Sequence, residues 1–553
     1  MVVQFPIFEQ PAAGHRDWYL YEALRSVPRI LLMLDRNPVS PAYGCFDREY
    51  WHYRTTDFPC GMNEEFTLVL AQAWATEHPQ NPFYHNARLQ ELIVAALRFA
   101  AKSAHPDGSC DDYFPFEKAR GATSFSLYAT TESYLLLGLN DPSLKAFFIR
   151  RADWMLRHQE SGRLANHQAL GALAMQNVFQ VTGETRFRTG METLRDLTLS
   201  WQHAEGWFQE YEGADPGYQT CTISFLGKLR QKTGDARLME PLRRAAEFAA
   251  HFMHPDGSYG GEYGSRNTYH FYPHGFELLA AESPAALQVA ELYLRKGLPQ
   301  RTRYFNDDNR MCAHYAYEWF QAWQDYARVP DRATASCQTP AHTTWFPAAG
   351  LLVQRDTQRC VIAAAHKGGV FKVITPEGLV ASDTGVMLPL ENGQTLVSHL
   401  VNLQNEIQWN AATQTLTVKG KLCRRRAPLM TPLKQMVFRV LALTIGRVNP
   451  NWLRLIVQKL FITGKATTEA TFTRTLRLTA TGVEVTDEVQ RSGGPAVTAV
   501  LAAPDSTSIY VASSNPFQAA NLLPVRRLDK LKNELLKTGQ GIQTVLISCP
   551  AGK

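Results

Sequence analysis

Glycine-centred turns recur through the first 330 residues of this 553-residue chain at an almost constant interval. Successive turns lie about 50 residues apart, the length of two helices with their connections. Each turn precedes a weakly charged helix-like segment, and amphipathic segments with apolar residues at i, i+3, i+4 and i+7 lie between the turns. The spacing therefore predicts six helical hairpins. The turn residues are Gly61, Gly108, Gly162, Gly206 and Gly257, with Asp308–Asn309 in the sixth place.

The weakly charged helices are expected to form an inner ring and the charged helices an outer ring, as in an incomplete (α/α)6-type toroid over residues 1–330. Loops on a rigid scaffold commonly carry function, so the turns before the inner helices are the predicted site. After a linker at 331–345, short alternating segments such as RCVIAAAH and TLTVKGKLC predict antiparallel strands. Residues 346–553 are expected to form a β-sandwich, which makes the fold class α+β and multidomain.

One segment of the β-rich half has a different pattern. From Pro432 to Lys465 two short apolar segments, each carrying Lys or Arg, flank Gly446 and Asn449–Pro450. They predict a helical hairpin inserted at about 428–465, and three arginines, Arg424 to Arg426, precede it. Two interpretations stay open: helices that pack on their own domain, or a peripheral contact with a membrane surface or a partner.

Bulk properties restrict the partners. The formal net charge of +6 favours an anionic ligand weakly, but no concentrated basic stripe indicates nucleic-acid binding, and no nucleic-acid partner is expected. The nine cysteines lack paired C-x-x-C spacing, so reduced thiols are expected. Neither a signal peptide nor an apolar run of membrane-spanning length is visible. We expect a cytoplasmic or membrane-peripheral protein, or a periplasmic one after removal of a signal.

Three of the turns bring carboxylates, tyrosines, arginine or histidine to one end of the predicted ring. Acidic residues before a helix are also expected from capping and the helix dipole, which is the structural interpretation of Asp107, Asp111, Asp215 and Asp256. The repeated tyrosines are less easily explained in that way. The predicted substrate-binding residues of these turns are Tyr113, Arg120, Glu210, Tyr211, Tyr263, Arg266, Tyr269 and His270.

A more specific pattern follows the third turn, where SGRLANHQALGALAMQ puts Asn166 and His167 at the start of an inner helix. An asparagine near the N-cap, with an ordinary histidine in the first turn, is the simplest interpretation. About 50 residues later, EGWFQEYEGADPGYQTCTISF opens another inner helix with Tyr218. Together these elements resemble the heparinase II/III-like polysaccharide lyases, which include heparinase III and alginate lyases. The resemblance implies a toroid followed by a β-sandwich and an anionic polysaccharide or oligosaccharide as substrate.

A second part of the resemblance lies in the β-rich half. The family carries a His-x-His-x-x-Asp pattern, then Asp-x-Gly and a later His, and this chain has AAAHKGGVFKV, SDTGV and LVSHLVN. His366, Asp383 and His399 stand at the corresponding points, whereas Gly368 replaces the second His and the following Asp is missing. Some relatives bind structural zinc there. Asp383 and His399 are therefore the metal candidates of an incomplete site, and no other cofactor is expected.

The resemblance implies β-elimination at a uronic acid, with Asn166, His167, Tyr218 and His366 as the catalytic residues. Removal of the C5 proton creates negative charge beside the carboxylate of the uronic acid. Asn166, with His167, is expected to stabilise that charge. Tyr218 protonates the leaving O4 and in syn geometry also acts as base, which needs neighbours that lower its pKa from about 10. His366 is the expected base for anti elimination.

Three other functions fit the same predicted architecture. A glycoside hydrolase would need two carboxylates, for which Glu210 with Glu262 or Asp112 are the candidates. A uronyl C5-epimerase would share the proton abstraction and would leave the chain uncut. A non-catalytic protein that binds acidic glycan during polysaccharide assembly would fit the incomplete β-domain motif.

Overall fold

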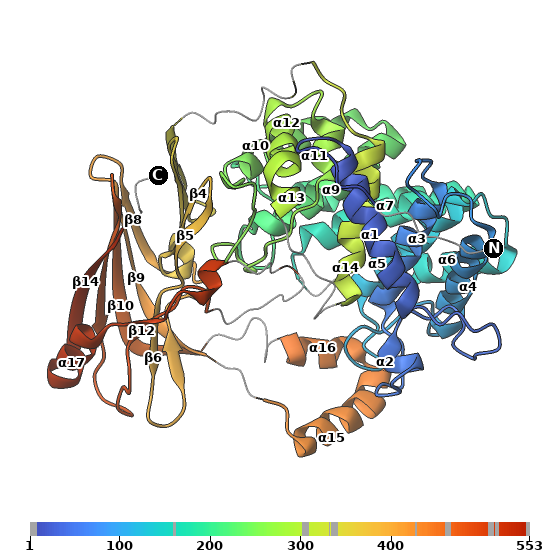
Figure 1. Ribbon diagram of the computed structural model, residues 1–553. Helices are drawn as coiled ribbons and strands as arrows, with labels where there is room; N and C mark the ends of the chain where they lie inside the picture. The colour runs from blue at the N-terminus through green and yellow to red at the C-terminus, as the bar shows by residue number, and fades with distance from the viewer. Residues whose placement is uncertain are drawn as a thin grey trace.

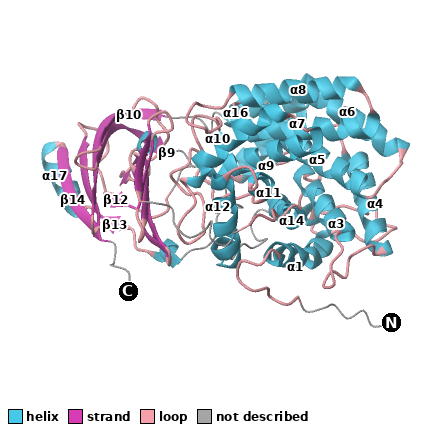
Figure 2. Cartoon of the chain, turned by 90° about the horizontal axis from the view of Figure 1, so that it is seen from above, coloured by secondary structure: helices cyan, strands magenta, loops and turns pink. Residues whose placement is uncertain are grey.

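The structure is a computed structural model that describes residues 8–158, 162–300, 309–330, 332, 341–425, 429–458, 466–506, 514 and 519–548. Helices fill the first part of the chain and strands the second, as Figures 1 and 2 show. The predicted α+β multidomain class, a helical toroid followed by an antiparallel β-domain, is confirmed.

Six inner helices form the ring of the toroid. Consecutive inner helices contact each other, and the last one, α14, contacts the first, α3, so that the ring closes. The inner helices are α3 (Phe66–Ala75), α5 (Arg120–Leu136), α7 (Ala165–Thr182), α9 (Pro216–Thr233), α11 (His274–Leu279) and α14 (Asn309–Gln324).

The outer helices pack against this ring. The first helix of the chain, α1, packs on the last inner helix, α14. Inner and outer helices differ as the charge pattern predicts, because the inner helices are buried almost throughout whereas the outer ones keep Arg, Lys and Glu at the surface. The outer helices are α1 (Asp17–Met33), α4 (Ala87–Ser103), α6 (Pro142–Arg157), α8 (Thr185–Ser200), α10 (Met239–Ala250) and α12 (Pro284–Leu292).

Three of the repeated glycines share a structural cause. Gly108, Gly206 and Gly257 have φ angles of +91°, +99° and +79°. A Cβ atom at these positions would lie 2.5 Å from the nitrogen of Arg151, 2.4 Å from the oxygen of Arg244 and 2.3 Å from the nitrogen of Gly297, respectively. Each turn therefore needs both a left-handed backbone and close contact with a neighbouring backbone, and glycine alone permits both.

The β-domain consists of two antiparallel sheets. The first has the order β1-β2-β3-β4-β5, and the second has the order β13-β12-β6-β7-β9-β10-β11-β14, with β8 paired to β9. The first sheet comprises β1 (His342–Phe346), β2 (Leu351–Arg355), β3 (Cys360–Ala364), β4 (Val370–Thr375) and β5 (Gly378–Asp383). The second comprises β6 (Val386–Pro389), β7 (Thr395–Val397), β8 (Glu406–Asn410), β9 (Thr415–Arg425), β10 (Ala466–Thr479), β11 (Gly482–Gln490), β12 (Leu501–Ala502), β13 (Arg526–Arg527) and β14 (Gln540–Ser548).

The first sheet is buried on both faces. Phe371 and Leu352 pack against the second sheet, in the core of the sandwich. Val353, Ile362 and Ile374, which alternate with them along the strands, belong instead to the same core as the toroid helices. This double burial explains the uninterrupted apolar sequence of β3, and it fixes the sandwich against one end of the ring.

Two helices lie within the predicted insertion, α15 (Pro432–Leu441) and α16 (Pro450–Gln458), joined through a π-helical turn at Ala442–Gly446. They pack on the toroid, whereas the simpler interpretation of the sequence placed them against their own domain. In Figure 1 they lie below the ring, near α2 (Arg48–Trp51). No helix in the described part of the chain is long and apolar enough to span a membrane.

Candidate active site

The start of α7 meets the loop that leads into α9. Asn166 is fully buried, and its side-chain amide donates to both carboxylate oxygens of Glu210, at 3.0 Å each. The backbone N–H of Asn166 donates to the same carboxylate at 3.0 Å. A backbone bridge between Leu164 and Glu210 holds the two segments in register. Asn166 is the second residue of α7 and does not cap it, since the N-cap is Leu164; its amide instead binds an acidic group from the next turn.

Burial dominates the electrostatics of this pair. Removal from water raises the pKa of Glu210 to about 8, although the hydrogen bonds from Asn166 and the positive charge of Arg266 act in the opposite direction. At neutral pH the carboxyl group of Glu210 is therefore mainly protonated. The side-chain oxygen Oδ1 of Asn166 is buried and accepts no hydrogen bond in the described part of the structure.

Tyr218 lies in the first turn of α9, beside residues of the following loop. Its ring is 4.9 Å from the ring of His270, centroid to centroid. Burial raises the pKa of Tyr218 well above its ordinary value, and the charge of Arg266 only partly opposes this effect. The guanidinium group of Arg266 lies 4.3 Å above the ring of Tyr211. Four of the predicted site residues thus come together here, and the hydroxyl of Tyr218 is protonated at neutral pH.

One carboxylate connects the two loops. Asp215 caps α9 by accepting from the backbone N–H of Tyr218 at 3.0 Å, and it also accepts from the N–H of Arg266 at 2.8 Å and from the hydroxyl of Thr268. The capping role expected for Asp215 is therefore accompanied by a second one, since the same side chain fixes Arg266 relative to Tyr218.

His270 and His167 differ in their surroundings. His270 is fully buried, and its Nδ1 forms a hydrogen bond with the hydroxyl of Tyr315 on α14. His167 follows Asn166 on α7, is partly exposed, and its ring meets that of Phe125 edge to face at 6.0 Å. Of these two imidazoles, His167 is the one with solvent access.

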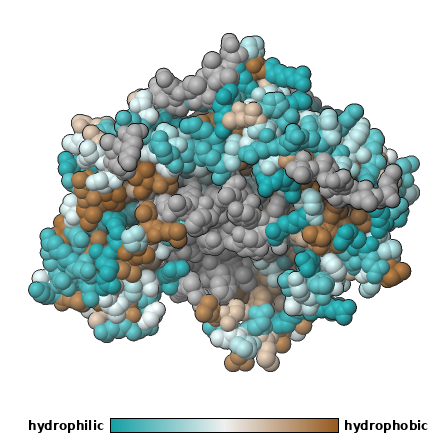
Figure 3. All heavy atoms as spheres, viewed as in Figure 1, coloured by the Kyte–Doolittle hydropathy of each residue, from teal (hydrophilic) through white to brown (hydrophobic). Residues whose placement is uncertain are grey.

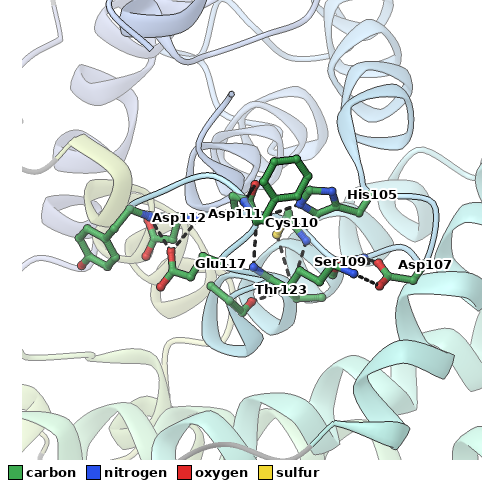
Figure 4. Close-up of polar contacts among 12 residues, drawn as sticks. His105, Asp107, Ser109, Cys110, Asp111, Asp112, Glu117 and Thr123 are labelled. Atoms are coloured by element: carbon green, nitrogen blue, oxygen red, sulfur yellow. Dashed lines mark hydrogen bonds and ion pairs between the residues drawn. The ribbon is translucent and has the colours of Figure 1, made fainter. Parts of the chain in front are cut away.

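The turn before α5, shown in Figure 4, uses its carboxylates for its own backbone. Asp111 accepts from the N–H groups of Phe116 at 2.8 Å and Lys118 at 2.9 Å, and it also pairs with His105 at 2.9 Å. Glu117 accepts from the N–H groups that follow Asp111, those of residues 112 and 113. These contacts agree with the structural interpretation of the acidic residues in this turn.

Two predicted substrate-binding residues of this turn take no part in the contacts of Asn166 and Tyr218 described above. Tyr113 is 63% exposed at the surface. Arg120 is buried, and its Nε donates to the backbone oxygen of His158 at 2.7 Å. Arg120 thus supports the end of a neighbouring outer helix.

Tyr269 and Tyr263, from the loop before α11, lie at the junction with the β-domain. The hydroxyl of Tyr269 donates to both oxygens of Glu262, at 2.7 and 2.6 Å, and Lys372 of strand β4 forms an ion pair with the same carboxylate at 2.6 Å. Tyr263 is buried, and its hydroxyl bonds with His254 at 2.8 Å. Glu262 is therefore already engaged by a cation and a phenol.

His366 and Lys367 are adjacent in the sequence, but their side chains contact different parts of the structure. His366 is partly buried beside the turn of Gly350, where a Cβ atom would lie 2.1 Å from the imidazole, and burial lowers its pKa. Lys367 enters the toroid instead, where its ammonium group donates to the backbone oxygens of Glu262 and Gly264. Sequence reasoning missed Lys367 and Lys372, although a lysine within an apolar strand such as GGVFKVI is a signal for a buried partner.

The two metal candidates of the β-domain, Asp383 and His399, are both buried, and Asp383 is paired with arginines. Asp383 is buried between the guanidinium groups of Arg474, at 2.8 Å, and Arg526. His399 is buried, and desolvation lowers its pKa to about 3. In the described ranges no three His, Cys, Asp or Glu side chains form a group that could hold a metal ion.

Solved structures with a similar fold are known. The chondroitin AC lyase of Streptomyces coelicolor A3, solved with chondroitin sulphate, matches 90% of this chain and 69% of its own with 13% identity and a TM-score of 0.52. Heparinase III matches 78% of this chain and 62% of its own with 10% identity and a TM-score of 0.43. An unsaturated glucuronyl hydrolase from Bacillus sp. GL1 matches 48% of this chain and 85% of its own with 10% identity and a TM-score of 0.37.

No protein-family model matches the chain, and no curated protein matches its sequence. The similarity to chondroitin AC lyase covers both parts of the chain and establishes the fold. The protein therefore has the architecture of the α/α-toroid polysaccharide lyases, a helical ring with a C-terminal β-domain. The resemblance inferred from Asn166, His167 and Tyr218 is confirmed at the level of the fold.

Proposed function

We propose that the protein is a polysaccharide lyase that cleaves a uronic-acid-containing polysaccharide by β-elimination. The observation that carries this proposal is the cluster in which Asn166 binds Glu210 while Tyr218 lies beside Arg266 and His270. It combines a carboxyl group that is neutral at pH 7, an amide, a protonated phenol and a guanidinium cation. This set matches the needs of elimination beside a carboxylate.

The first role is charge neutralisation. A substrate carboxylate resists loss of the C5 proton because the carbanion adds a second negative charge. Arg266, whose positive charge already acts on Glu210, can pair with that carboxylate. Rotation of the Asn166 amide by half a turn lets Glu210 donate to Oδ1 and leaves Nδ2 to stabilise the enolate-like intermediate.

The second role is proton transfer. Because burial keeps Tyr218 protonated, we assign it as the acid that protonates the departing O4 rather than as the base. The base that removes the C5 proton is assigned to His167, since it adjoins Asn166 and is partly exposed. His270 is fully buried and hydrogen-bonded to Tyr315, so it positions the ring of Tyr218.

The same contacts favour elimination over hydrolysis. A hydrolase needs two carboxyl groups that act on the glycosidic bond and on water. Glu210 has the raised pKa of an acid, but the candidate partner Glu262 is bound by Lys372 and Tyr269. The other candidate, Asp112, accepts from the thiol of Cys60 at 3.2 Å.

The test is a panel of acidic polysaccharides: heparan-type chains, hyaluronan, alginate, glucuronan and bacterial exopolysaccharides. The wild-type protein is expected to create the ultraviolet absorbance of a C4–C5 double bond on at least one of them. Tyr218→Phe should lower kcat by about 100-fold or more while the fold persists, because only the proton donor is lost. Tyr84→Phe, at a phenol 37% exposed near the end of α3, is the matched control and should keep full activity.

Each other outcome identifies a different function. New reducing ends without absorbance would indicate hydrolysis, and solvent hydrogen incorporated without cleavage would indicate epimerisation. Binding to a glycan without any turnover would indicate a non-catalytic role. A Tyr218→Phe variant with undiminished lyase activity would refute the assignment of the acid while leaving the reaction in place.

A further inference from the structure

The helical hairpin α15–α16 is fixed to the toroid through one face. Phe438 packs on Phe114 with ring centroids 5.2 Å apart, and Ala442 and Leu453 complete this small buried cluster. Arg439 forms an ion pair with Asp57. The guanidinium group of Arg447 lies 5.4 Å from the ring centroid of Phe116. Two of these partners belong to the turn shown in Figure 4, so the hairpin is held on a rigid support.

The opposite face of the hairpin carries large apolar side chains in water. Along α15 they follow the spacing i, i+3, i+4 and i+7 and therefore form one stripe. Figure 3 shows apolar side chains at the lower edge of the molecule, where Figure 1 places α15. The exposed fractions are 70% for Leu433, 66% for Met436, 53% for Val437 and 60% for Val440, followed by 43% for Leu443, 87% for Val448, 46% for Trp452 and 54% for Leu455.

The charge of the segment has a single sign. From residue 424 to residue 465 the sequence contains nine Lys or Arg and no Asp or Glu. Lys434 on α15 is exposed, as are Arg424 and Arg425 at the end of strand β9. An apolar face on a segment whose own charges are all positive is complementary to a membrane surface, which is apolar within and negatively charged at its anionic headgroups.

We propose that α15–α16 docks the protein on a membrane surface rich in anionic lipid, with the stripe of Leu433, Met436, Val437 and Val440 inserted at the level of the headgroups. An anionic polysaccharide would pair with the cations but would leave the aliphatic stripe in water. A second copy of this chain would bring its own cations against these, and like charges oppose that contact. The hairpin is too short to span a bilayer, so the contact is peripheral.

The experiment measures co-sedimentation of the full chain with vesicles. Wild-type protein is expected to bind vesicles of phosphatidylcholine mixed with phosphatidylglycerol and to bind phosphatidylcholine vesicles much less. The double variant Leu433→Asp/Val437→Asp should weaken binding to the anionic vesicles about tenfold or more, because two inserting side chains become charged. Lys434→Gln should weaken binding about fivefold, and added salt should act in the same direction.

A matched control introduces two aspartates in place of exposed aliphatic residues in another part of the molecule. Ile542→Asp/Leu546→Asp changes two aliphatic side chains on strand β14, 46% and 52% exposed, and should leave vesicle binding unchanged. Trp452 gives an independent readout, since its fluorescence should shift to the blue on anionic vesicles and this shift should vanish in Trp452→Phe. Circular dichroism confirms that each variant is folded.

Two results would overturn the proposal. One is equal sedimentation of wild type and Leu433→Asp/Val437→Asp with anionic vesicles. The other is wild-type self-association that the double variant abolishes, seen by sedimentation velocity, together with no vesicle binding, since the stripe would then be an interface between copies. Neither measurement depends on a glycan substrate, so the result is independent of the proposed lyase activity.

Discussion

The ammonium group of Lys372, on strand β4, lies 2.6 Å from the carboxylate of Glu262 in the toroid, and both side chains are almost completely buried. The hydroxyl of Tyr269 donates to the same carboxylate. This ion pair joins the two domains at the loop that also carries Arg266 and His270. The geometry of the candidate site is therefore coupled to the position of the sandwich.

Lys372→Met is predicted to destabilise the protein by about 3–5 kcal/mol, because it leaves Glu262 charged in a buried environment. The double variant Lys372→Met/Glu262→Gln should recover most of that loss, since it removes the unpaired charge. Urea unfolding of the wild type and of the three variants, including Glu262→Gln alone, measures the effect. Equal stability of Lys372→Met and the wild type would contradict the importance of this pair.

Glu210 gives a prediction for stability as a function of pH. Its pKa rises from the ordinary 4.5 to about 8 in the folded protein, so folding favours the protonated form. This contribution is fully present below pH 4.5 and is lost as the pH rises through 8, by up to about 1.4 kcal/mol per pH unit. Glu210→Gln stays neutral, so its melting temperature should match the wild type near pH 4.5 and exceed it above pH 8. Parallel melting curves across this range would show that Glu210 has an ordinary pKa.

The three histidines can be separated by the same conservative change to Asn. His167→Asn should lower kcat by about 100-fold or more, because the assigned base is lost. His366→Asn should keep activity within about twofold, since its ring packs against the turn of Gly350 and has no role in the proposed reaction. His270→Asn should alter the pH profile by releasing the ring of Tyr218. Loss of activity in His366→Asn and not in His167→Asn would restore the role that the family pattern implies for His366.

Two glycines with left-handed backbones predict a difference between two similar substitutions. Gly206 and Gly183 both have positive φ angles, +99° and +73°, but only Gly206 faces a backbone atom closely. Gly183→Ala should cost about 1 kcal/mol, the price of the left-handed conformation alone. Gly206→Ala should cost at least about 2 kcal/mol, because the added Cβ also meets the oxygen of Arg244. Melting temperatures measure both, and equal costs would mean that the contact relaxes freely.

The ring was predictable because three of its turn glycines meet the same local requirement, a left-handed turn packed against a neighbouring backbone. Asn166 and Tyr218 were found because the family pattern implies such residues at the start of two inner helices, whose positions the repeat predicts. Glu210 was identified as a site residue, but its contact with Asn166 depends on the pairing of two loops, which spacing does not encode. Lys367 escaped prediction for a related reason: its partners are backbone oxygens of a loop about 100 residues earlier in the sequence.

The packing of α1 on α14 has a consequence for how the ring is made. Asp17 of α1 accepts from the indole N–H of Trp323 at 2.8 Å, and Tyr19 donates to Glu277 at 2.9 Å. A ribosome that has just produced α1 must add about 300 further residues before these partners leave the exit tunnel. The first helix to be synthesised is thus among the last to find its place, and during that interval its apolar face is open to chaperones.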